Sequence, residues 1–283
     1  MSNFHKKPNI YVTEIVLRVE NLNRSVEFYK TIMGFKVLVE KDKEVILTAD
    51  GTKPIVTLIQ PRDIIPKIPR RTGLYHFAVL LPDRLQLGLF LKNIREHKYP
   101  LVGGSNHGVS EAIYLEDPDQ NGIEVYTDTP EDRWKPDGEN IDMVTEILDY
   151  DSLLESTGDK QWNKAPNDTI IGHIHLHVAD LDEAYKFYKA LGFEITQKIK
   201  NHAYFISTGG YHHHIGLNIW NGKGAAPLPK NSAGMEYYTI AFPDKGILDK
   251  ALNDLRTLGF EIVEDEDSIF IHDPSNNLIK LKL

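Results

Sequence analysis

The sequence contains two copies of each of two different segments, and this nested repetition constrains the fold more than any other feature. The stretch VTEIVLRVENLNRSVEFYKTIMGFKV at 12–37 resembles IGHIHLHVADLDEAYKFYKALGFEI at 171–195. A second pair, at 73–95 and 234–256, is followed in both cases by an Asp-Pro turn and a terminal strand-like stretch. The chain is therefore expected to consist of four related units arranged in two similar halves.

Each unit has the pattern of a strand, a helix and then short strands separated by Gly, Pro and Asn turns, which gives a βαβββ order. Gly34 and Gly192 lie where the first helix of each half would end in a left-handed residue. Stretches such as EIVLRV and HIHLHV alternate or run apolar, as strands with one buried face do, so the sequence predicts an α+β fold. The expected halves are 9–130, with units 9–62 and 72–130, and 169–283, with units 169–222 and 233–283, joined by a polar linker over 131–168 that carries a helix at 142–156.

Composition excludes several classes of protein. Hydrophobic residues make up 41% and charged residues 26% of the chain, which is typical of a globular protein and not of a disordered or fibrous one. A formal net charge of −9 without a long basic run makes a nucleic-acid or anionic-membrane partner unexpected. No apolar run approaches the ~20 residues of a membrane span, and the first residues lack a signal-type apolar stretch, so a soluble cytoplasmic protein is expected. Since the chain has no Cys, any metal must bind to His, Asp, Glu or Tyr.

Three side chains on strand-like stretches are candidate metal ligands: His76 in YHFAVLL, Glu124 in GIEVY and His173 in IGHIHLHV. An isolated His on an apolar strand is usually a hydrogen-bonded core residue. A carboxylate between Ile and Val is harder to explain in this way, because a buried charge is costly unless it is paired or bound to a metal. Two imidazoles and one carboxylate together form the facial set that holds Fe(II) and leaves positions open.

Internal alignment locates this site on the second and third units. The equivalent positions of the first and fourth units hold Glu14, Tyr237 and Lys280. A charged Lys cannot be a ligand, so the fourth unit is excluded, and units one and four are expected to form the other sheet. His175 and His177 alternate with His173 and so share its face of the strand, which keeps them as alternative ligands.

Over nearly its whole length, the chain resembles the extradiol ring-cleavage dioxygenases of the catechol 2,3-dioxygenase type. These belong to the vicinal-oxygen-chelate (glyoxalase/bleomycin-resistance) superfamily. The phrases that carry the resemblance are GLYHFAVLLPDR, HGVSEAIYLEDPDQNGIEVY, IGHIHLHVADL and GGYHHHIGLNIW. The resemblance implies four βαβββ modules that form two incomplete barrel-like sheets. The family's usual site lies on modules 3 and 4, and this sequence departs from that pattern with its ligands on modules 2 and 3.

The resemblance also implies an activity, namely an Fe(II)-dependent extradiol dioxygenase that cleaves catechol or a substituted catechol with O2, with Mn(II) as an alternative metal. The partners would be this small molecule and O2, and a homo-oligomer is compatible because members of the superfamily often assemble. The fourth corner of the site carries Gly216 and Asn218, which are not usual ligands and would leave positions for substrate and oxygen. The alternatives are a metal-dependent glyoxalase-like isomerase or lyase, and a non-catalytic ligand-sequestering protein of the same fold.

The family's catalytic residues match three further positions. Its acid–base His aligns with His213, where a one-residue slip would give His212 or His214 and leaves that choice open. Its Tyr ten residues before the ligand Glu aligns with Tyr114, expected to hydrogen-bond a catecholate oxygen, and its His-Gly phrase aligns with His107, expected to donate to developing charge. A neutral imidazole near pKa 6.5 can accept a catechol proton and later return it. Without the resemblance, these residues would be read as a surface His run, a core Tyr and a loop His.

Overall fold

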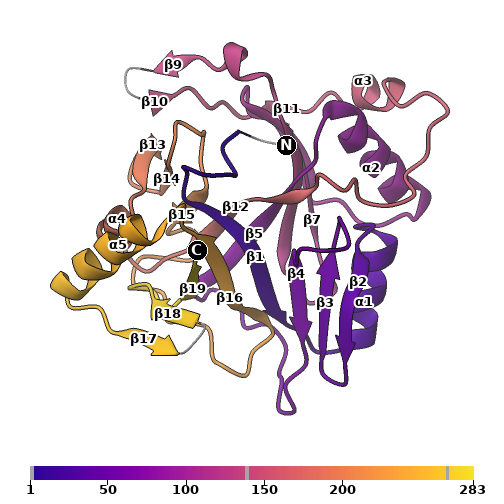
Figure 1. The fold of residues 1–283 in the computed structure, drawn as a ribbon. Helices are drawn as coiled ribbons and strands as arrows, with labels where there is room; N and C mark the ends of the chain where they lie inside the picture. The colour runs from indigo at the N-terminus through magenta and orange to yellow at the C-terminus, as the bar shows by residue number, and fades with distance from the viewer. Residues whose placement is uncertain (1–2, 138–139, 266–267) are drawn as a thin grey trace.

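The computed structural model describes residues 3–137, 140–265 and 268–283, and it contains two large curved sheets, each built from two of the repeated units (Figure 1). The first sheet joins the first and fourth units, with strands in the order β17 (Ile262–Asp265), β18 (Ser268–His272), β19 (Leu278–Lys282), β16 (Gly234–Ala241), β1 (Tyr11–Arg18), β4 (Val56–Ile59), β3 (Glu44–Thr48) and β2 (Lys36–Lys41). The second sheet joins the second and third units, in the order β11 (Glu146–Ile147), β6 (Gly103–Asn106), β7 (Ser110–Glu116), β8 (Gly122–Asp128), β5 (Gly73–Leu80), β12 (Ile170–His177), β15 (Ile215–Asn218), β14 (Ala203–Ser207) and β13 (Glu194–Ile199). The predicted fold class is confirmed.

The halves of the chain are joined at the centre of both sheets. The first strand of unit one, β1, pairs antiparallel with β16, the first strand of unit four. In the same way β5 of unit two pairs antiparallel with β12 of unit three. Each half therefore contributes part of both sheets, and each sheet is complete only when the two halves associate.

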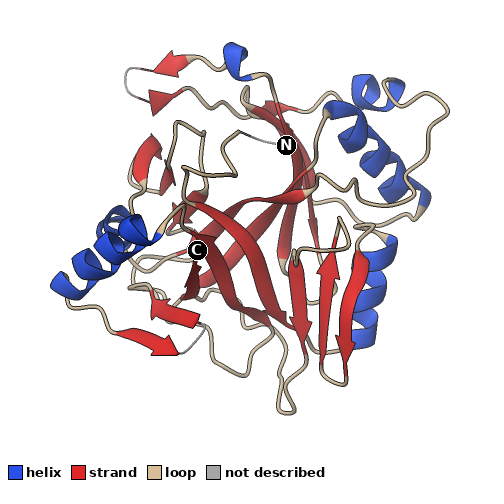
Figure 2. Ribbon diagram, in the orientation of Figure 1, coloured by secondary structure: helices blue, strands red, loops and turns tan. Residues whose placement is uncertain are grey.

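The helices α1 (Leu22–Thr31), α2 (Arg84–Glu96), α3 (Tyr150–Glu155), α4 (Leu181–Ala190) and α5 (Lys245–Thr257) lie around the outside, with the strands in the middle (Figure 2). The four longer helices begin at Asn21, Asp83, Asp180 and Asp244, whose side chains accept backbone N–H groups of the first turn. Gly34 and Gly192 follow α1 and α4 with φ of 75° and 103°, as expected for left-handed residues that end a helix.

One cluster of buried hydrophobic side chains fills the space between the sheets and helices and includes residues of all four units. Ile15 of β1 and Ile174 of β12 both belong to it, and these two strands pack against each other where the sheets meet. Because the same core supports both sheets, the positions of the strands in the second sheet depend on the packing of the whole chain.

The predicted helix at 142–156 is wrong in extent. The helix α3 covers only Tyr150–Glu155 and begins after Asp149, whose side chain accepts from the N–H of Ser152. The residues before it form β11, which pairs antiparallel with β6 at the edge of the second sheet. An edge strand offers unpaired backbone groups, and here those of β6 pair with residues 146–147, which become an additional strand. A short pair, β9 (Pro136–Asp137) and β10 (Asn140–Ile141), and the 3-10 helix η1 (Glu131–Arg133) occupy the start of the predicted linker, within which residues 138–139 lie outside the described residues.

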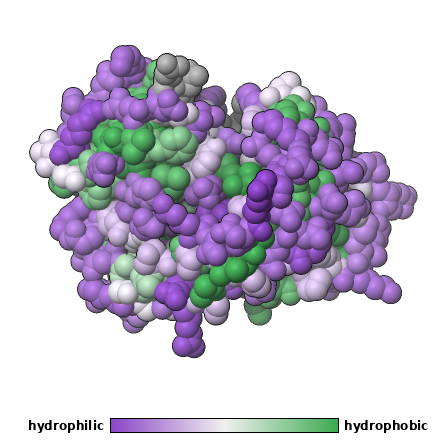
Figure 3. All heavy atoms as spheres, turned by 90° about the horizontal axis from the view of Figure 1, so that it is seen from below, coloured by the Kyte–Doolittle hydropathy of each residue, from purple (hydrophilic) through white to green (hydrophobic). Residues whose placement is uncertain are grey.

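Among the described residues, no helix combines the length and apolar character needed to cross a bilayer. On the face shown in Figure 3, hydrophilic residues cover most of the surface and hydrophobic residues form separate patches between them.

Candidate metal centre

The two candidate histidines lie beside bulges in the central strand pair of the second sheet. His76 on β5 pairs with His175 on β12, but the next pair is Leu74 with Leu176, which leaves Tyr75 as the extra residue. As a result the neighbouring residues Tyr75 and His76 both line one cavity, instead of pointing to opposite faces of the sheet.

A second bulge lies next to His173. Ile171 pairs with Val79 and His173 with Ala78, so that Gly172 is the extra residue on β12. A Cβ atom at Gly172 would lie 1.8 Å from the Oη of Tyr126, so glycine at this position lets the Tyr126 side chain lie against the backbone of β12. The carbonyl oxygen of Gly172 accepts a hydrogen bond from Nε2 of His5, 2.7 Å away, which ties the N-terminal segment to this bulge.

Glu124 completes the group from the other side of β5. It lies on β8, which runs parallel to β5, with Glu124 opposite Ala78. Its Oε2 is 3.1 Å from Nε2 of His76 and 3.2 Å from Nε2 of His173. One ligand atom from each of the three side chains lies within 4.8 Å of the others, and all three residues are buried. The structure thus brings together the three residues predicted as ligands.

The environment gives Glu124 and His173 the protonation states that a cation site needs. Burial opposes ionisation of Glu124, but the charge and hydrogen bond of His173, together with the nearby His76, outweigh it and hold the pKa of this carboxyl well below its usual range. Burial lowers the pKa of His173 to about 4, against the partial opposition of Glu124. A carboxylate and neutral imidazoles are the protonation states in which these side chains bind metals.

The hydrogen bonding of the group also fits a metal ion. Nε2 of His76 has no hydrogen-bond partner among the described residues, although it lies 3.1 Å from the carboxylate of Glu124. A buried polar atom without a partner costs about 1–3 kcal/mol. A divalent cation between the three side chains would accept the lone pairs of both Nε2 atoms and the carboxylate, and two nitrogens with one oxygen suit Fe(II) or Mn(II).

The other sheet repeats the bulges without the ligands. Thr13 and Glu236 are the extra residues in the β1–β16 pair, next to Glu14 and Tyr237. Glu14 accepts a hydrogen bond of 2.9 Å from the hydroxyl of Thr57. The backbone can therefore form the same scaffold twice, and the side chains decide which copy can hold a cation.

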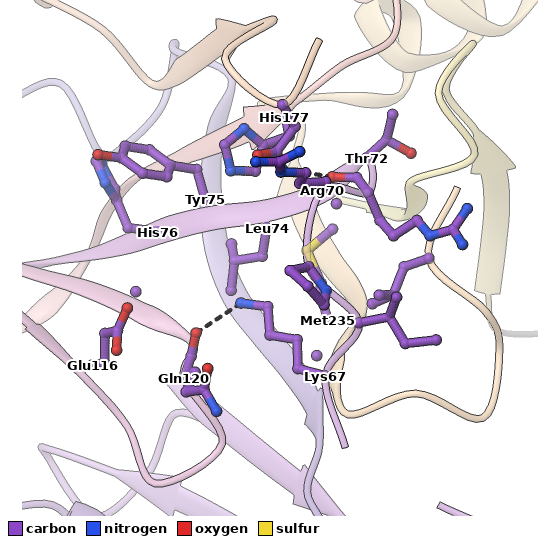
Figure 4. Close-up of a pocket in the computed structure, with 18 of the residues that line it drawn as sticks. Lys67, Arg70, Thr72, Leu74, Tyr75, His76, Glu116, Gln120, His177 and Met235 are labelled. Carbon is purple, nitrogen blue, oxygen red and sulfur yellow. Dashed lines mark hydrogen bonds between the residues drawn. The ribbon is translucent and has the colours of Figure 1, made fainter. Parts of the chain in front are cut away.

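A cavity of about 400 Å³ borders the group of candidate ligands. The residues that line it include Glu124, Tyr114, His107, His213, Phe205 and Trp220. It adjoins a second cavity of about 350 Å³, with which it shares Tyr75, His76, Val102 and Tyr114. Figure 4 shows this second cavity, with Tyr75 and His76 to one side and the Nζ of Lys67 donating to the backbone oxygen of Gln120 at 2.8 Å. His76 thus borders both cavities, and a ligand in the first is surrounded by the residues predicted to carry the chemistry.

Of the three adjacent histidines, His213 lines this cavity, with its ring 4.1 Å from that of His173 between centroids. His212 and His214 hydrogen-bond within the cavity wall, to Asp128 at 2.9 Å and to the backbone oxygen of Phe4 at 3.2 Å. This arrangement favours the register that places the acid–base residue at His213.

Tyr114 and His107 form a pair at the opposite wall. Nδ1 of His107 lies 2.7 Å from the backbone oxygen of Val144, so it must donate there, and Nε2 lies 2.8 Å from the hydroxyl of Tyr114. In a neutral ring Nε2 then accepts the proton of Tyr114. This differs from the expectation that His107 donates to charge in the cavity, because both of its nitrogens are already engaged.

The alternative ligands lie beside the cluster rather than in it. His175 lines the cavity with its ring 5.0 Å from that of His76 between centroids, and its buried Nε2 has no hydrogen-bond partner among the described residues. Nδ1 of His177 is 2.7 Å from the amide oxygen of Asn218. Sequence reasoning missed Asp128, which contacts His212. The signal was available, since Asp128 follows Glu124 by two steps of strand alternation and so shares its face of β8.

Comparisons with known proteins agree with the fold. The family model of the Glyoxalase/Bleomycin resistance protein/Dioxygenase superfamily matches residues 11–125 and 170–281. Catechol-2,3-dioxygenase of Bacillus subtilis (strain 168) is 46% identical to the chain, over 97% of this chain and 96% of the relative. Among solved structures, a putative dioxygenase from Bacillus subtilis subsp. subtilis str. 168 has a TM-score of 0.65 at 14% identity, covering 98% of this chain and 85% of that one. Glyoxalase I from Zea mays has a TM-score of 0.60 at 17% identity, covering 96% and 92%. At these identities the two solved structures show similarity of fold alone.

Proposed function

The chain belongs to the Glyoxalase/Bleomycin resistance protein/Dioxygenase superfamily, and from this membership we propose that it is a metal-dependent extradiol dioxygenase that opens the ring of a catechol with O2. The observation that carries the proposal is the buried cluster of His76, Glu124 and His173, of which His76 and Glu124 line a cavity together with His213 and Tyr114. The name of the Bacillus subtilis relative, which matches nearly the full length of both chains, supports the same activity.

Fe(II) is the proposed metal, with Mn(II) as the alternative, held by His76, Glu124 and His173. When bound, such an ion supplies positions at which both oxygens of a catechol and O2 can bind together. Asn218, on the strand where a fourth protein ligand would lie, is already paired with His177. This leaves room for substrate and disfavours a glyoxalase-like site closed by four protein ligands.

His213 is the proposed acid and base. Nδ1 of its ring lies 2.8 Å from Nδ1 of His212, which leaves Nε2 as the nitrogen available to the cavity. There it can take the proton of a catechol hydroxyl as the substrate binds and return it when the ring opens.

Tyr114 is proposed to hold a substrate oxygen. Its burial and the nearby charge of Glu124 raise its pKa well above 10, so it remains a phenol. The hydroxyl of Tyr114 lies 2.8 Å from Nε2 of His107, and this hydrogen bond orients the hydroxyl when no substrate is present. When substrate binds, the hydroxyl hydrogen can turn toward a substrate oxygen in the cavity. The aromatic side chains of Phe205 and Trp220 give the cavity apolar walls that suit a flat ring.

Anaerobic reconstitution with Fe(II), followed by addition of catechol and O2, tests the proposal. We expect one O2 consumed per catechol and a coloured ring-opened product. His76→Ala should lose both metal and activity, whereas Tyr237→Phe, at the equivalent position of the other sheet, should keep both. A metal-loaded protein that consumes no O2 with catechol or its simple substituted forms would contradict the proposed function.

A further inference from the structure

A chain of hydrogen bonds leads from His213 away from the metal cluster toward the surface. Nδ1 of His213 is 2.8 Å from Nδ1 of His212, and Nε2 of His212 is 2.9 Å from Oδ1 of Asp128. His212 is fully buried, while the side chain of Asp128 is 21% exposed. Three side chains thus connect the cavity with the solvent.

The donors and acceptors of this chain determine where its protons lie. A carboxylate can only accept, so Nε2 of His212 must carry a hydrogen toward Asp128. Nδ1 of a neutral His212 is then a lone pair, which must accept the N–H at Nδ1 of His213. Nε2 of His213 is consequently left without a hydrogen, and this is the nitrogen that remains for the cavity.

We propose that Asp128 and His212 are positioning residues that keep His213 in the tautomer of a base and carry its proton to solvent and back. The proposal rests on the proposed function for its catalytic consequence, whereas the tautomers follow from the hydrogen-bond geometry with His212 neutral. In a catalytic triad a carboxylate orients a catalytic imidazole by a hydrogen bond. Here Asp128 is the carboxylate and His213 the catalytic imidazole, and His212 lies between them.

The proton balance of the relay closes. When Nε2 of His213 takes a proton from a catechol hydroxyl, its Nδ1 proton passes to Nδ1 of His212, and the Nε2 proton of His212 passes through Asp128 to water. Both imidazoles end neutral with inverted tautomers, and His213 now presents an N–H to the cavity as an acid. The reverse sequence returns one proton from water to the product and restores the first state.

This neutrality matters because of where His213 lies. Its ring packs against His173 and against Phe205, with centroids 4.1 Å and 5.0 Å away. A lasting positive charge at such a buried position, next to a cation site, would be costly. A relay that exports the proton allows a buried histidine to act as a base without holding that charge.

The tautomers can be measured on the metal-free protein by nitrogen-15 NMR of the histidine rings. We expect a proton on Nδ1 of His213 and on Nε2 of His212. Asp128→Asn replaces the carboxylate by an amide that can donate to Nε2 of His212, and it should shift both rings away from these tautomers. Tyr211→Phe is the matched control. It removes the other side-chain hydrogen bond of Asp128, at 3.1 Å, and the bond to the hydroxyl of Tyr126, at 2.6 Å, but it keeps the ring and should leave the tautomers unchanged. The opposite tautomers in the unmodified protein would overturn the proposal, whatever reaction the protein catalyses.

The catalytic arm uses the Fe(II)-loaded protein. Asp128→Asn should keep stoichiometric metal and a KM for catechol within a few-fold, while kcat falls by ~10²-fold or more, the scale of a positioned acid–base group. Asp128→Glu, which keeps a carboxylate, should recover much of this loss, and His212→Gln serves as a second break in the chain if Asp128→Asn fails to fold. Unchanged kcat in both broken relays would refute the relay. If the unmodified protein lacks dioxygenase activity, the proposed function fails, and the NMR result still decides whether Asp128 and His212 set the tautomer of His213.

Discussion

Replacing Glu124 by Gln is the most direct perturbation of the metal centre. Glu124 is the anionic member of the cluster, and its Oε2 lies within 3.2 Å of the Nε2 atoms of both His76 and His173. Gln keeps the shape and one acceptor oxygen but removes the charge. We therefore expect Glu124→Gln to fold, to be less stable without metal, and to lose most of its affinity for Fe(II) or Mn(II).

The magnitude follows from the linkage between metal binding and folding. A metal present at 100 times its dissociation constant stabilises the folded state by about 2.7 kcal/mol. For a chain of this size, 1 kcal/mol changes Tm by roughly 2–4 °C, so the metal should raise Tm by roughly 5–10 °C. In Glu124→Gln this increase should be near zero at the same metal concentration. Separately, the loss of a charge-assisted hydrogen bond should lower the stability of the metal-free variant by about 1.5–3 kcal/mol.

The assay is anaerobic thermal unfolding with and without Fe(II), combined with metal analysis after dialysis. Glu14→Gln is the control, because Glu14 occupies the position of the other sheet that corresponds to His173, and its carboxylate accepts a hydrogen bond from Thr57. It should show the full metal-dependent increase in Tm. A Glu124→Gln variant that keeps stoichiometric metal and the full increase would refute the assignment of the carboxylate ligand.

Three further changes test other parts of the structure. Gly172→Ala would place a Cβ 1.8 Å from Oη of Tyr126, and overpacking of this kind costs about 1–3 kcal/mol; urea unfolding should show this loss together with weaker metal binding. Gly103→Ala, whose Cβ would meet open space, should lack both effects. Tyr114→Phe should keep the metal but lower kcat by roughly 10²-fold, as expected for loss of one group that stabilises developing charge, and an unchanged kcat would exclude that role. Burial lowers the pKa of His5 from 6.5 to about 4, so the unfolded chain takes up a proton first as the pH falls. The contribution of His5 to the free energy of unfolding should then decrease between pH 6.5 and 4 by on the order of 3 kcal/mol, and His5→Gln should reduce the slope by this amount; the same slope in both proteins would contradict it.

The repeats contained enough information to predict how the units pair. Because Lys280 cannot be a ligand while His76 and His173 can, units two and three had to share one sheet if a metal was held, and the strand order agrees. The prediction succeeded because it depended on residue types and on a repeated pattern, both of which survive without three-dimensional information.

Features that depend on local backbone irregularity or on contacts in the assembled fold could not be predicted from residue types and repeats. The bulge at Tyr75 adds a residue to one strand, and strict alternation would have placed Tyr75 on the face opposite His76. β11 forms because the edge of β6 is free, which is a property of the assembled sheet and not of residues 146–147. The tautomer of His213 likewise depends on Asp128, a residue far from it in the sequence.

The joining of the two halves at the centre of both sheets has a consequence for how the protein is made. As the chain leaves the ribosome, His76 and Glu124 emerge well before His173, and β1 must wait for β16 near the end of synthesis. Contacts this distant in sequence form slowly, and until then β1 and β5 present unpaired edges. The proposed metal site can therefore form only after His173 has emerged, and the nascent N-terminal half is the species that depends most on protection from aggregation.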